Sequence, residues 1–159
     1  MYIKLGGNFV MKKYWKFLAM ILVATVFMFV MMYFNTYKLD QVYFSQTRAF
    51  MALMMGAAMT IIMLLFMWKM YNNKKINSII LLVSILIFTG SLFMVRSQTG
   101  VNDKVWMEAM IPHHSIAIMT SKRAQLKDPK VKKLAKEIIV SQEKEIKEMK
   151  RLIKDQPQN

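Results

Sequence analysis

The two histidines of this sequence stand side by side, one and two helical turns after two methionines. The stretch reads Met107-Glu108-Ala109-Met110-Ile111-Pro112-His113-His114, and the sequence contains no other histidine and no cysteine. In a helix, Met107, Met110 and His114 would fall within a sector of about 60° on one face. Thioether and imidazole donors without thiolate form a ligand set that suits Cu(I). The competing interpretation is structural, because methionines at helical spacing usually fill a core.

Candidate partners for these ligands lie near the end of the chain. Residues 129–154 are expected to form a helix whose apolar stripe includes Leu134 and Met149. Gln142 and Glu145 interrupt this stripe on the same face, where a polar group is costly unless it has a partner. We therefore expect Glu145 either to bind a metal or to contact a ligand histidine. In the alternative interpretation, both residues lie at a wet seam and fix the register of the helices.

Two helices must position these residues. Asn102 or Asp103 can cap the first helix, which should extend to about residue 127. Pro112 should bend that helix close to the histidines. Asp128 followed by Pro129 is a typical start of the second helix.

The same region resembles a known protein family. Met110-Ile111-Pro112-His113-His114, followed by Ala117 and Met119, is similar to the first-helix signature of the domain-of-unknown-function family numbered 305. The second-helix signature is matched by Leu134-Ala135, Ile138-Ile139, Gln142, Glu145-Ile146 and Met149. The resemblance covers about residues 103–153 and implies a small ferritin-like helical domain that binds copper in the bacterial envelope. Longer members of the family carry two such helix pairs, whereas this sequence carries one.

The motif and the resemblance together give a set of candidate site residues. The candidate metal ligands are Met107, Met110, His113, His114, Met149 and Glu145. Gln142 and Glu145 are the candidates for holding a ligand in place.

Three long apolar stretches precede this region. Residues 17–34, 49–68 and 76–95 contain no charged residue, and each is long enough to cross a bilayer. Seven lysines lie before the first stretch or between the second and third, whereas the segment between the first two carries only Lys38 and Arg48. This excess of positive charge predicts a cytoplasmic N-terminus, and three crossings then place residues 96–159 outside the cytoplasm.

The net charge of +14 would suit a nucleic-acid-binding protein. Many of the basic residues flank or connect the apolar stretches, however, where they are expected to set membrane topology. We therefore expect anionic lipid and no nucleic acid as a partner. An enzyme is not expected either, because the sequence has neither a Glu-x-x-His pair nor a glycine-rich phosphate loop.

The sequence thus predicts an all-α protein with three parts. These are a basic cytoplasmic N-terminus (1–16), three transmembrane helices within residues 17–95, and an extracytoplasmic ferritin-like helical hairpin (96–159). Two helices of about 25 residues bury too little apolar surface to be stable alone. We therefore expect a homodimer, or a higher homo-oligomer, that completes a four-helix bundle. The expected function is that of a bacterial membrane-anchored protein that binds Cu(I) or Ag(I) for metal handling or resistance.

Two alternatives of other classes stay open. The methionine ladder Met51, Met55, Met59, Met63 and Met67 in the second apolar stretch resembles that of eukaryotic-type copper-uptake channels. At about 100° per residue, however, a four-residue repeat drifts around the helix and does not line one face of a pore. The other alternative is a structural oligomerisation module that binds no metal.

Overall fold

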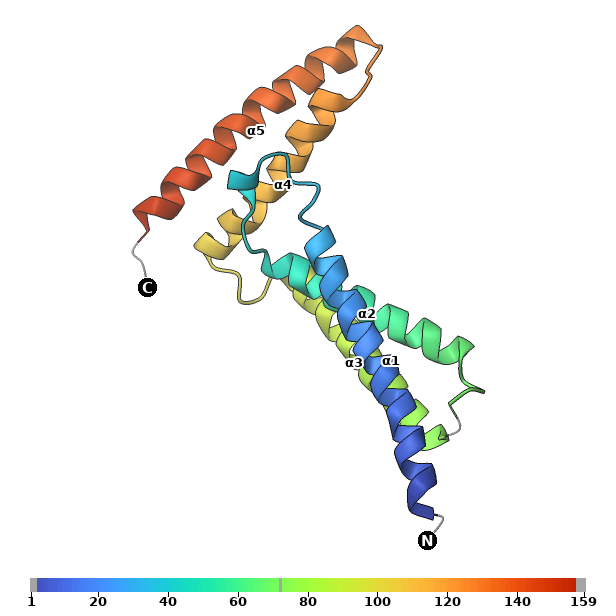
Figure 1. The fold of residues 1–159 in the computed structure, drawn as a ribbon. Helices are drawn as coiled ribbons and strands as arrows, with labels where there is room; N and C mark the ends of the chain where they lie inside the picture. The colour runs from blue at the N-terminus through green and yellow to red at the C-terminus, as the bar shows by residue number, and fades with distance from the viewer. Residues whose placement is uncertain (1–2, 72, 157–159) are drawn as a thin grey trace. The chain divides into compact units, whose positions relative to one another are not determined.

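The computed structural model describes residues 3–71 and 73–156, and every regular element within these ranges is helical (Figure 1). The helices are α1 (Ile3–Met31), the short 3-10 helix η1 (Leu39–Gln41), α2 (Gln46–Phe66), α3 (Lys74–Ser97), α4 (Asp103–Arg123) and α5 (Pro129–Asp155). The predicted all-α class is therefore confirmed for this part of the chain. The first two residues of the predicted N-terminal segment, Asn72, and the last three residues of the predicted hairpin region lie outside the described residues.

The chain forms two compact units that do not follow the sequence order. One unit contains residues 1–30 and 47–99 and holds the three long apolar helices. The other joins residues 31–46 to residues 100–159 and holds η1, α4 and α5. The segment 31–46, which we call the docking loop, is thus a part of the hairpin unit although it connects α1 to α2.

Three helices of the first unit are long and apolar enough to cross a membrane. They are Met11–Met31 within α1, Gln46–Phe66 (α2) and Lys74–Ser97 (α3). Each overlaps one of the predicted apolar stretches, although the first two helices end earlier than predicted, at Met31 and Phe66. The composition and the lengths of these three helices are therefore both compatible with a membrane protein.

Small residues form the buried face of α2. Ala52, Gly56, Ala57 and Thr60 are buried there together with Leu64. A Cβ atom added to Gly56 would collide with the Thr25 hydroxyl of α1. Small residues of this kind allow the backbones of apolar helices to approach closely.

The methionine ladder lies outside this buried face. Met51 is exposed, and the other members of the ladder are only half-buried: Met55, Met59, Met63 and Met67. The ladder is therefore not enclosed by the three helices of one chain.

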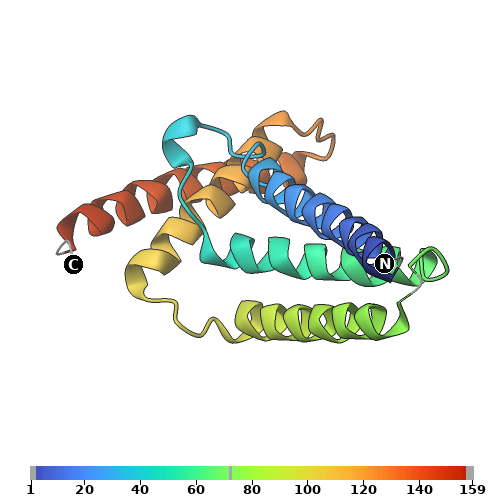
Figure 2. The same ribbon diagram turned by 60° about the horizontal axis from the view of Figure 1, so that its bottom comes forward.

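A buried polar network joins α1 to Tyr71, which follows α2, and to Asn77 of α3. Figure 2 shows the ribbon of these three helices. The Tyr14 hydroxyl donates to Asn77 Oδ1 at 2.6 Å, and the Asn77 amide donates to the Tyr71 carbonyl at 2.9 Å. Asn77 is fully buried, so these bonds satisfy an amide that would otherwise be costly to enclose.

In the second unit, α4 and α5 pack side by side as an antiparallel hairpin in both views (Figures 1 and 2). Asn102 caps α4 by accepting from the Val105 amide at 2.9 Å. Asp128 caps α5, with Pro129 in its first turn. Both predicted helix starts are confirmed, whereas α4 ends at Arg123, before the predicted residue 127. The shorter α4 leaves residues 124–128 as an extended connection.

The core of this unit lies between the two helices. It is built from Met107, Ile111, Ile118, Ile146 and Met149. Tyr37 and Tyr43 of the docking loop pack against it, so three segments of the chain contribute to one core.

The contact at Gly56 gives a prediction for the first unit. We expect Gly56→Ala to lower the Tm of the full chain in detergent, because the added methyl must displace the Thr25 side chain. Overpacking of this kind typically costs about 1–3 kcal/mol. Gly90→Ala is the matched control, because a Cβ at Gly90 meets nothing within 4 Å and so should not lower the Tm. Equal Tm values for the two variants would contradict the close approach of α1 and α2.

Candidate metal-binding site

An imidazole of α4 and a carboxylate of α5 meet on the hairpin. His114 Nδ1 lies 3.0 Å from Glu145 Oε2, while Glu145 Oε1 accepts a hydrogen bond from the Ser141 hydroxyl at 2.7 Å. The close pair is not oriented as a hydrogen bond, so the buried Nδ1 atom has no hydrogen-bond partner among the described residues. The carboxylate nevertheless stands beside this nitrogen. Because Nδ1 faces Glu145, Nε2 is the nitrogen that remains for an external ligand.

The environment of His114 favours the neutral imidazole. Burial lowers the pKa of His114 below its ordinary value, and the positive charge of protonated His113 lowers it further. The carboxylate of Glu145 opposes both effects but does not reverse them. The neutral form, which is the one that binds metal ions, therefore predominates at neutral pH.

The methionines of the predicted set divide between the core and its margin. Met107 and Met149 are 5% and 7% exposed and belong to the apolar core. Met110 is half-buried and packs against that core from outside. Packing alone is a sufficient structural role for Met107 and Met149, as methionines at helical spacing often have.

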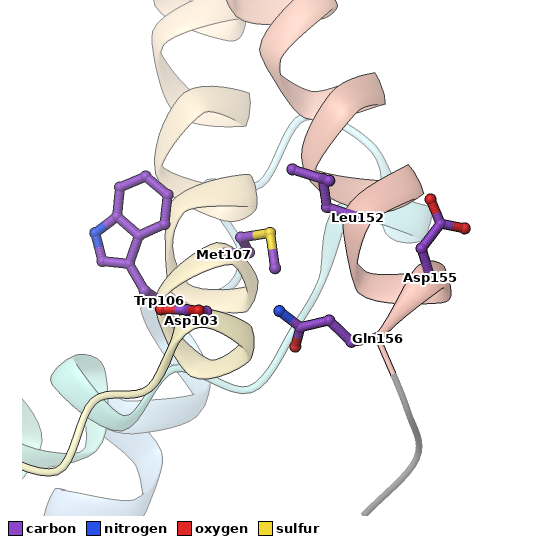
Figure 3. Close-up of a pocket in the computed structure, with 6 residues that line it drawn as sticks. All are labelled: Asp103, Trp106, Met107, Leu152, Asp155 and Gln156. Atoms are coloured by element: carbon purple, nitrogen blue, oxygen red, sulfur yellow. The ribbon is translucent and has the colours of Figure 1, made fainter.

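A cavity at the open end of the hairpin reaches one of the core methionines. It has a volume of about 530 Å³ and lies between the first turns of α4 and the last turn of α5. In Figure 3 the Met107 side chain lies between α4 and α5, with Trp106 on one side and Leu152 on the other. The Met107 thioether is therefore accessible from this end although its side chain is almost fully buried.

The remaining candidates are His113 and Gln142. His113 is exposed, and its ring centroid lies 6.3 Å from that of His114. Gln142 is half-buried and makes no hydrogen bond within the described residues. Its expected role in holding a ligand stays a prediction.

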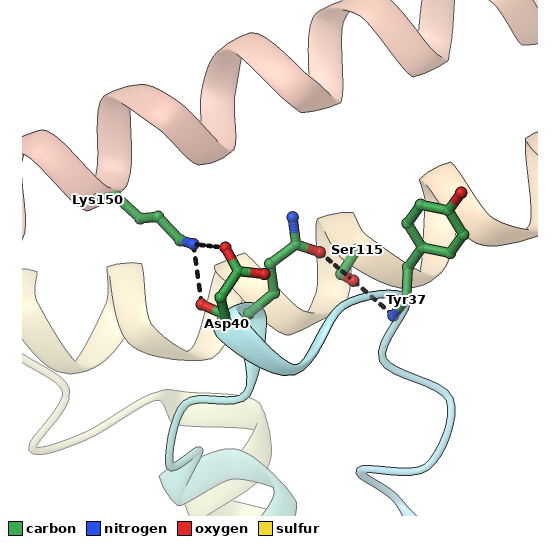
Figure 4. Close-up of polar contacts among 5 residues, drawn as sticks. Tyr37, Asp40, Ser115 and Lys150 are labelled. Carbon is green, nitrogen blue, oxygen red and sulfur yellow. Dashed lines mark hydrogen bonds and ion pairs between the residues drawn. The ribbon is translucent and has the colours of Figure 1, made fainter.

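A buried serine fixes the docking loop to α4. The Tyr37 backbone amide donates to the Ser115 hydroxyl at 2.8 Å, and that hydroxyl donates to Gln41 Oε1 at 2.6 Å. Figure 4 shows the bond between Tyr37 and Ser115 together with the contact of Lys150 to Asp40. Ser115 is fully buried and Gln41 is 7% exposed. The hydroxyl and the carbonyl thus satisfy each other in a place that water does not reach.

Ionic contacts extend this attachment along the hairpin. Lys150 of α5 contacts the Asp40 carboxylate at 2.7 Å and the Asp40 carbonyl at 2.8 Å. Lys122 of α4 contacts Glu143 of α5 at 2.7 Å and lies over the ring of Tyr37. The docking loop therefore covers one face of the two-helix layer.

Part of the candidate ligand set, Met110, His113 and Glu145, lies on the other face. At about 100° per residue, Met110 and His113 are about 140–160° around α4 from Ser115, which marks the covered side. Leu134 and Glu145 are likewise about 140–160° around α5 from Lys150. We call this uncovered side the open face. It carries imidazole, thioether and carboxylate groups beside exposed apolar side chains.

The attachment of the docking loop to the hairpin was not predicted from the sequence, in which this segment simply separates two apolar stretches. Two signals for its attachment exist. Asp40 is the first acidic residue of the chain, and no other precedes Asp103, so an ionic partner from a distant segment was to be expected. Ser115 interrupts the apolar face of α4, where a hydroxyl requires a partner.

A cluster of hard metal ligands is the other kind of site to consider in the described residues. Within residues 3–71 and 73–156, no group of three or more histidine, aspartate or glutamate side chains is arranged to hold a metal ion. The donors at the open face are instead one carboxylate, imidazoles and a thioether.

Comparison with known proteins supports the resemblance noted for this region. Residues 94–153 match a family model described as "Domain of unknown function (DUF305)". An uncharacterized protein of Acanthamoeba polyphaga mimivirus is 38% identical to this chain over 86 residues, which are 53% of this chain. The chain spans 57% of the length of that relative. No solved structure matches the chain.

The buried serine gives a prediction for the attachment of the docking loop. Ser115→Ala leaves the Gln41 carbonyl and the Tyr37 amide without their partner, which typically costs about 1–3 kcal/mol of unfolding free energy. We expect a lower Tm and faster amide hydrogen exchange in residues 36–42. Thr120→Ala is the control, because the exposed Thr120 hydroxyl bonds only to carbonyls of its own helix. If exchange in the docking loop were the same in both variants, Ser115 would not be its anchor.

Proposed function

We propose that the protein is a membrane-anchored copper-binding protein that holds Cu(I) or Ag(I) on the open face of the hairpin. The observation that carries this proposal is the pairing of the half-buried His114 with Glu145, on the face where Met110 lies. A neutral imidazole with a carboxylate beside one nitrogen is a common arrangement of a histidine that binds a metal through the other nitrogen.

The candidate ligands take different parts in this proposal. His114, through Nε2, and Met110 are the leading donors, with the exposed His113 as their neighbour. Met107 is available through the cavity at the open end of the hairpin. Glu145 orients the imidazole, since its two oxygens already face His114 and Ser141. Met149 would have to leave the core to bind a metal, so it is the weakest member of the set.

The donor types favour a soft monovalent ion. Thioether sulfur is a good ligand for Cu(I) and Ag(I), whereas Zn(II) is usually bound by thiolate, imidazole or carboxylate. The chain has no cysteine, and its described residues contain no cluster of three imidazole or carboxylate groups. We propose binding and handling of the ion and not catalysis.

Copper binding can be tested with the full chain in detergent by competition against a Cu(I) chelator. Met110→Ala combined with His114→Ala should weaken binding by more than about 100-fold, because loss of an outer partner alone typically costs about 10- to 100-fold. Glu145→Gln should fall in that lower range. Met119→Ala is the control, because Met119 lies about 180° around α4 from Met110 and should not matter. Unchanged affinity in the double variant would place the metal elsewhere.

We further propose that α1, α2 and α3 cross the cytoplasmic membrane with the N-terminus inside. Three crossings put the docking loop and the hairpin on the same side, in agreement with their contacts within one unit. The excess of lysine before α1 and between α2 and α3 favours the cytoplasm for those segments.

This orientation predicts the behaviour of reporter fusions. A reporter that is active only in the cytoplasm should be silent when it is fused after Asn159. The same reporter inserted between α2 and α3 should be active, which provides the positive control. A bright signal from the C-terminal fusion would reverse the proposed orientation and would remove the support for an envelope function.

The open face also suggests the arrangement of an oligomer. The sequence predicted an apolar stripe on α5 that includes Leu134 and Met149, but Met149 is buried in the core between α4 and α5 within one chain. Leu134 remains 55% exposed, and Trp106 and Leu152 are exposed as well. Because the docking loop already covers the opposite side, we propose that a second copy packs on the open face and completes a four-helix bundle.

Two glutamate variants of α5 distinguish a loss of dimerisation from a general loss of stability. Leu134→Glu should convert a dimer into a monomer in analytical ultracentrifugation, because it places a charge in the proposed contact. Val140→Glu should remain dimeric, since Val140 is 69% exposed but lies about 120° away on α5. Both variants should keep the helical circular dichroism of the parent. A monomeric parent protein at micromolar concentration would exclude the bundle.

A further inference from the structure

A second cavity lies between the docking loop and the hairpin, on the side away from the candidate metal ligands. Its volume is about 270 Å³. The docking loop contributes Lys38, Asp40 and Gln41 to its lining, and α5 contributes Glu143, Lys147 and Lys150. Unlike the cavity beside Met107, it is lined mainly by polar and charged side chains.

The charges around this cavity do not cancel. Lys150 pairs with Asp40 and Lys122 pairs with Glu143, which accounts for both carboxylates. Lys38 and Lys147 have no ion pair or hydrogen bond among the described residues, so two ammonium groups are in excess. Their charges, after the direct bond from Lys122, help to lower the pKa of Glu143. A cavity with this excess attracts an anion.

The fold also supplies an oriented neutral donor. Gln41 is 7% exposed, and its carbonyl oxygen is committed to the Ser115 hydroxyl. Its amide nitrogen forms no hydrogen bond with another described residue, and Gln41 lines the cavity. The Gln41 amide N–H groups are not used within the described residues, so they can donate to a ligand with acceptor oxygens in this cavity.

We propose that the cavity binds a phosphate group, with Lys38 and Lys147 supplying charge and the Gln41 amide supplying a directed hydrogen bond. A phosphate offers several acceptor oxygens together with negative charge, which is the combination that these donors require. The favoured source is the headgroup of an anionic lipid, because Lys38 follows the end of the apolar helix α1 at Met31 by only seven residues. Free phosphate has the same chemistry and is the other source. This proposal does not depend on copper binding.

The proposal can be tested by isothermal titration of the full chain in a nonionic detergent. The probes are short-chain phosphatidylglycerol, phosphatidylcholine of the same chain length, and inorganic phosphate. Phosphatidylglycerol should bind saturably and phosphatidylcholine should not. The double variant Lys38→Gln with Lys147→Gln should weaken binding at least tenfold, while keeping the Lys150–Asp40 pair and the parent Tm.

A charge-matched control makes the outcome decisive. Lys136→Gln with Lys144→Gln removes the same charge from α5 at positions outside the cavity lining, and it should bind as the parent does. Saturable binding of inorganic phosphate alone, with the same dependence on Lys38 and Lys147, would support the site with free phosphate as its ligand. Equal weakening in both double variants would reduce the effect to overall charge and overturn the proposal. Failure of both phosphatidylglycerol and phosphate to bind saturably would overturn it as well.

Discussion

The second unit depends on the attachment of the docking loop to α4 through the buried hydroxyl of Ser115. That hydroxyl accepts from the Tyr37 backbone and donates to Gln41, so one side chain satisfies two groups of a segment that has little regular structure of its own. Without this attachment, the apolar surface that Tyr37 and Tyr43 cover would be open to water on one side of the hairpin. The docking loop thereby encloses one side of the core between α4 and α5, although in the sequence it connects α1 to α2.

The same attachment determines in which directions the two histidines of α4 point. Ser115 and His114 are neighbours on α4, about 100° apart around its axis. Once Ser115 is buried under the docking loop, His114 must point toward the seam with α5, where Glu145 lies 3.0 Å away. The rotation of α4 that places the serine therefore also aims the imidazole, and the exposed His113 results from the same rotation. Loss of the loop attachment would therefore change the orientation of His114 at the candidate metal site, although no atom of the loop is among the candidate donors.

The helices could be predicted from the sequence because their signals are local. Charge-free stretches, the Asn102 cap and the Asp128-Pro129 start each act within a few residues, and the structure has all of them. The sequence also drew attention to Glu145, although its side chain is 44% exposed and so is not enclosed in the apolar stripe. The sequence could not predict which methionines are buried. Met107 and Met110 share a sector of about 60°, and this pattern does not distinguish a residue that faces the core from one at its margin. The docking loop was missed because its contacts join residues more than 70 positions apart.

The charge of the hairpin region bears on the choice of metal ion. From Arg96 onward, 14 basic residues stand against 8 acidic ones, so this region carries a net charge of +6. A cation that approaches the open face is therefore repelled by the domain as a whole, and the repulsion doubles from a monovalent to a divalent ion. Salt screens this effect beyond about 8 Å, which leaves the lysines nearest to the site as the main source. Glu145 supplies one local negative charge, enough to balance Cu(I) or Ag(I) but only half of the charge of Zn(II). Charge balance and ligand softness thus favour the same class of ion for independent reasons.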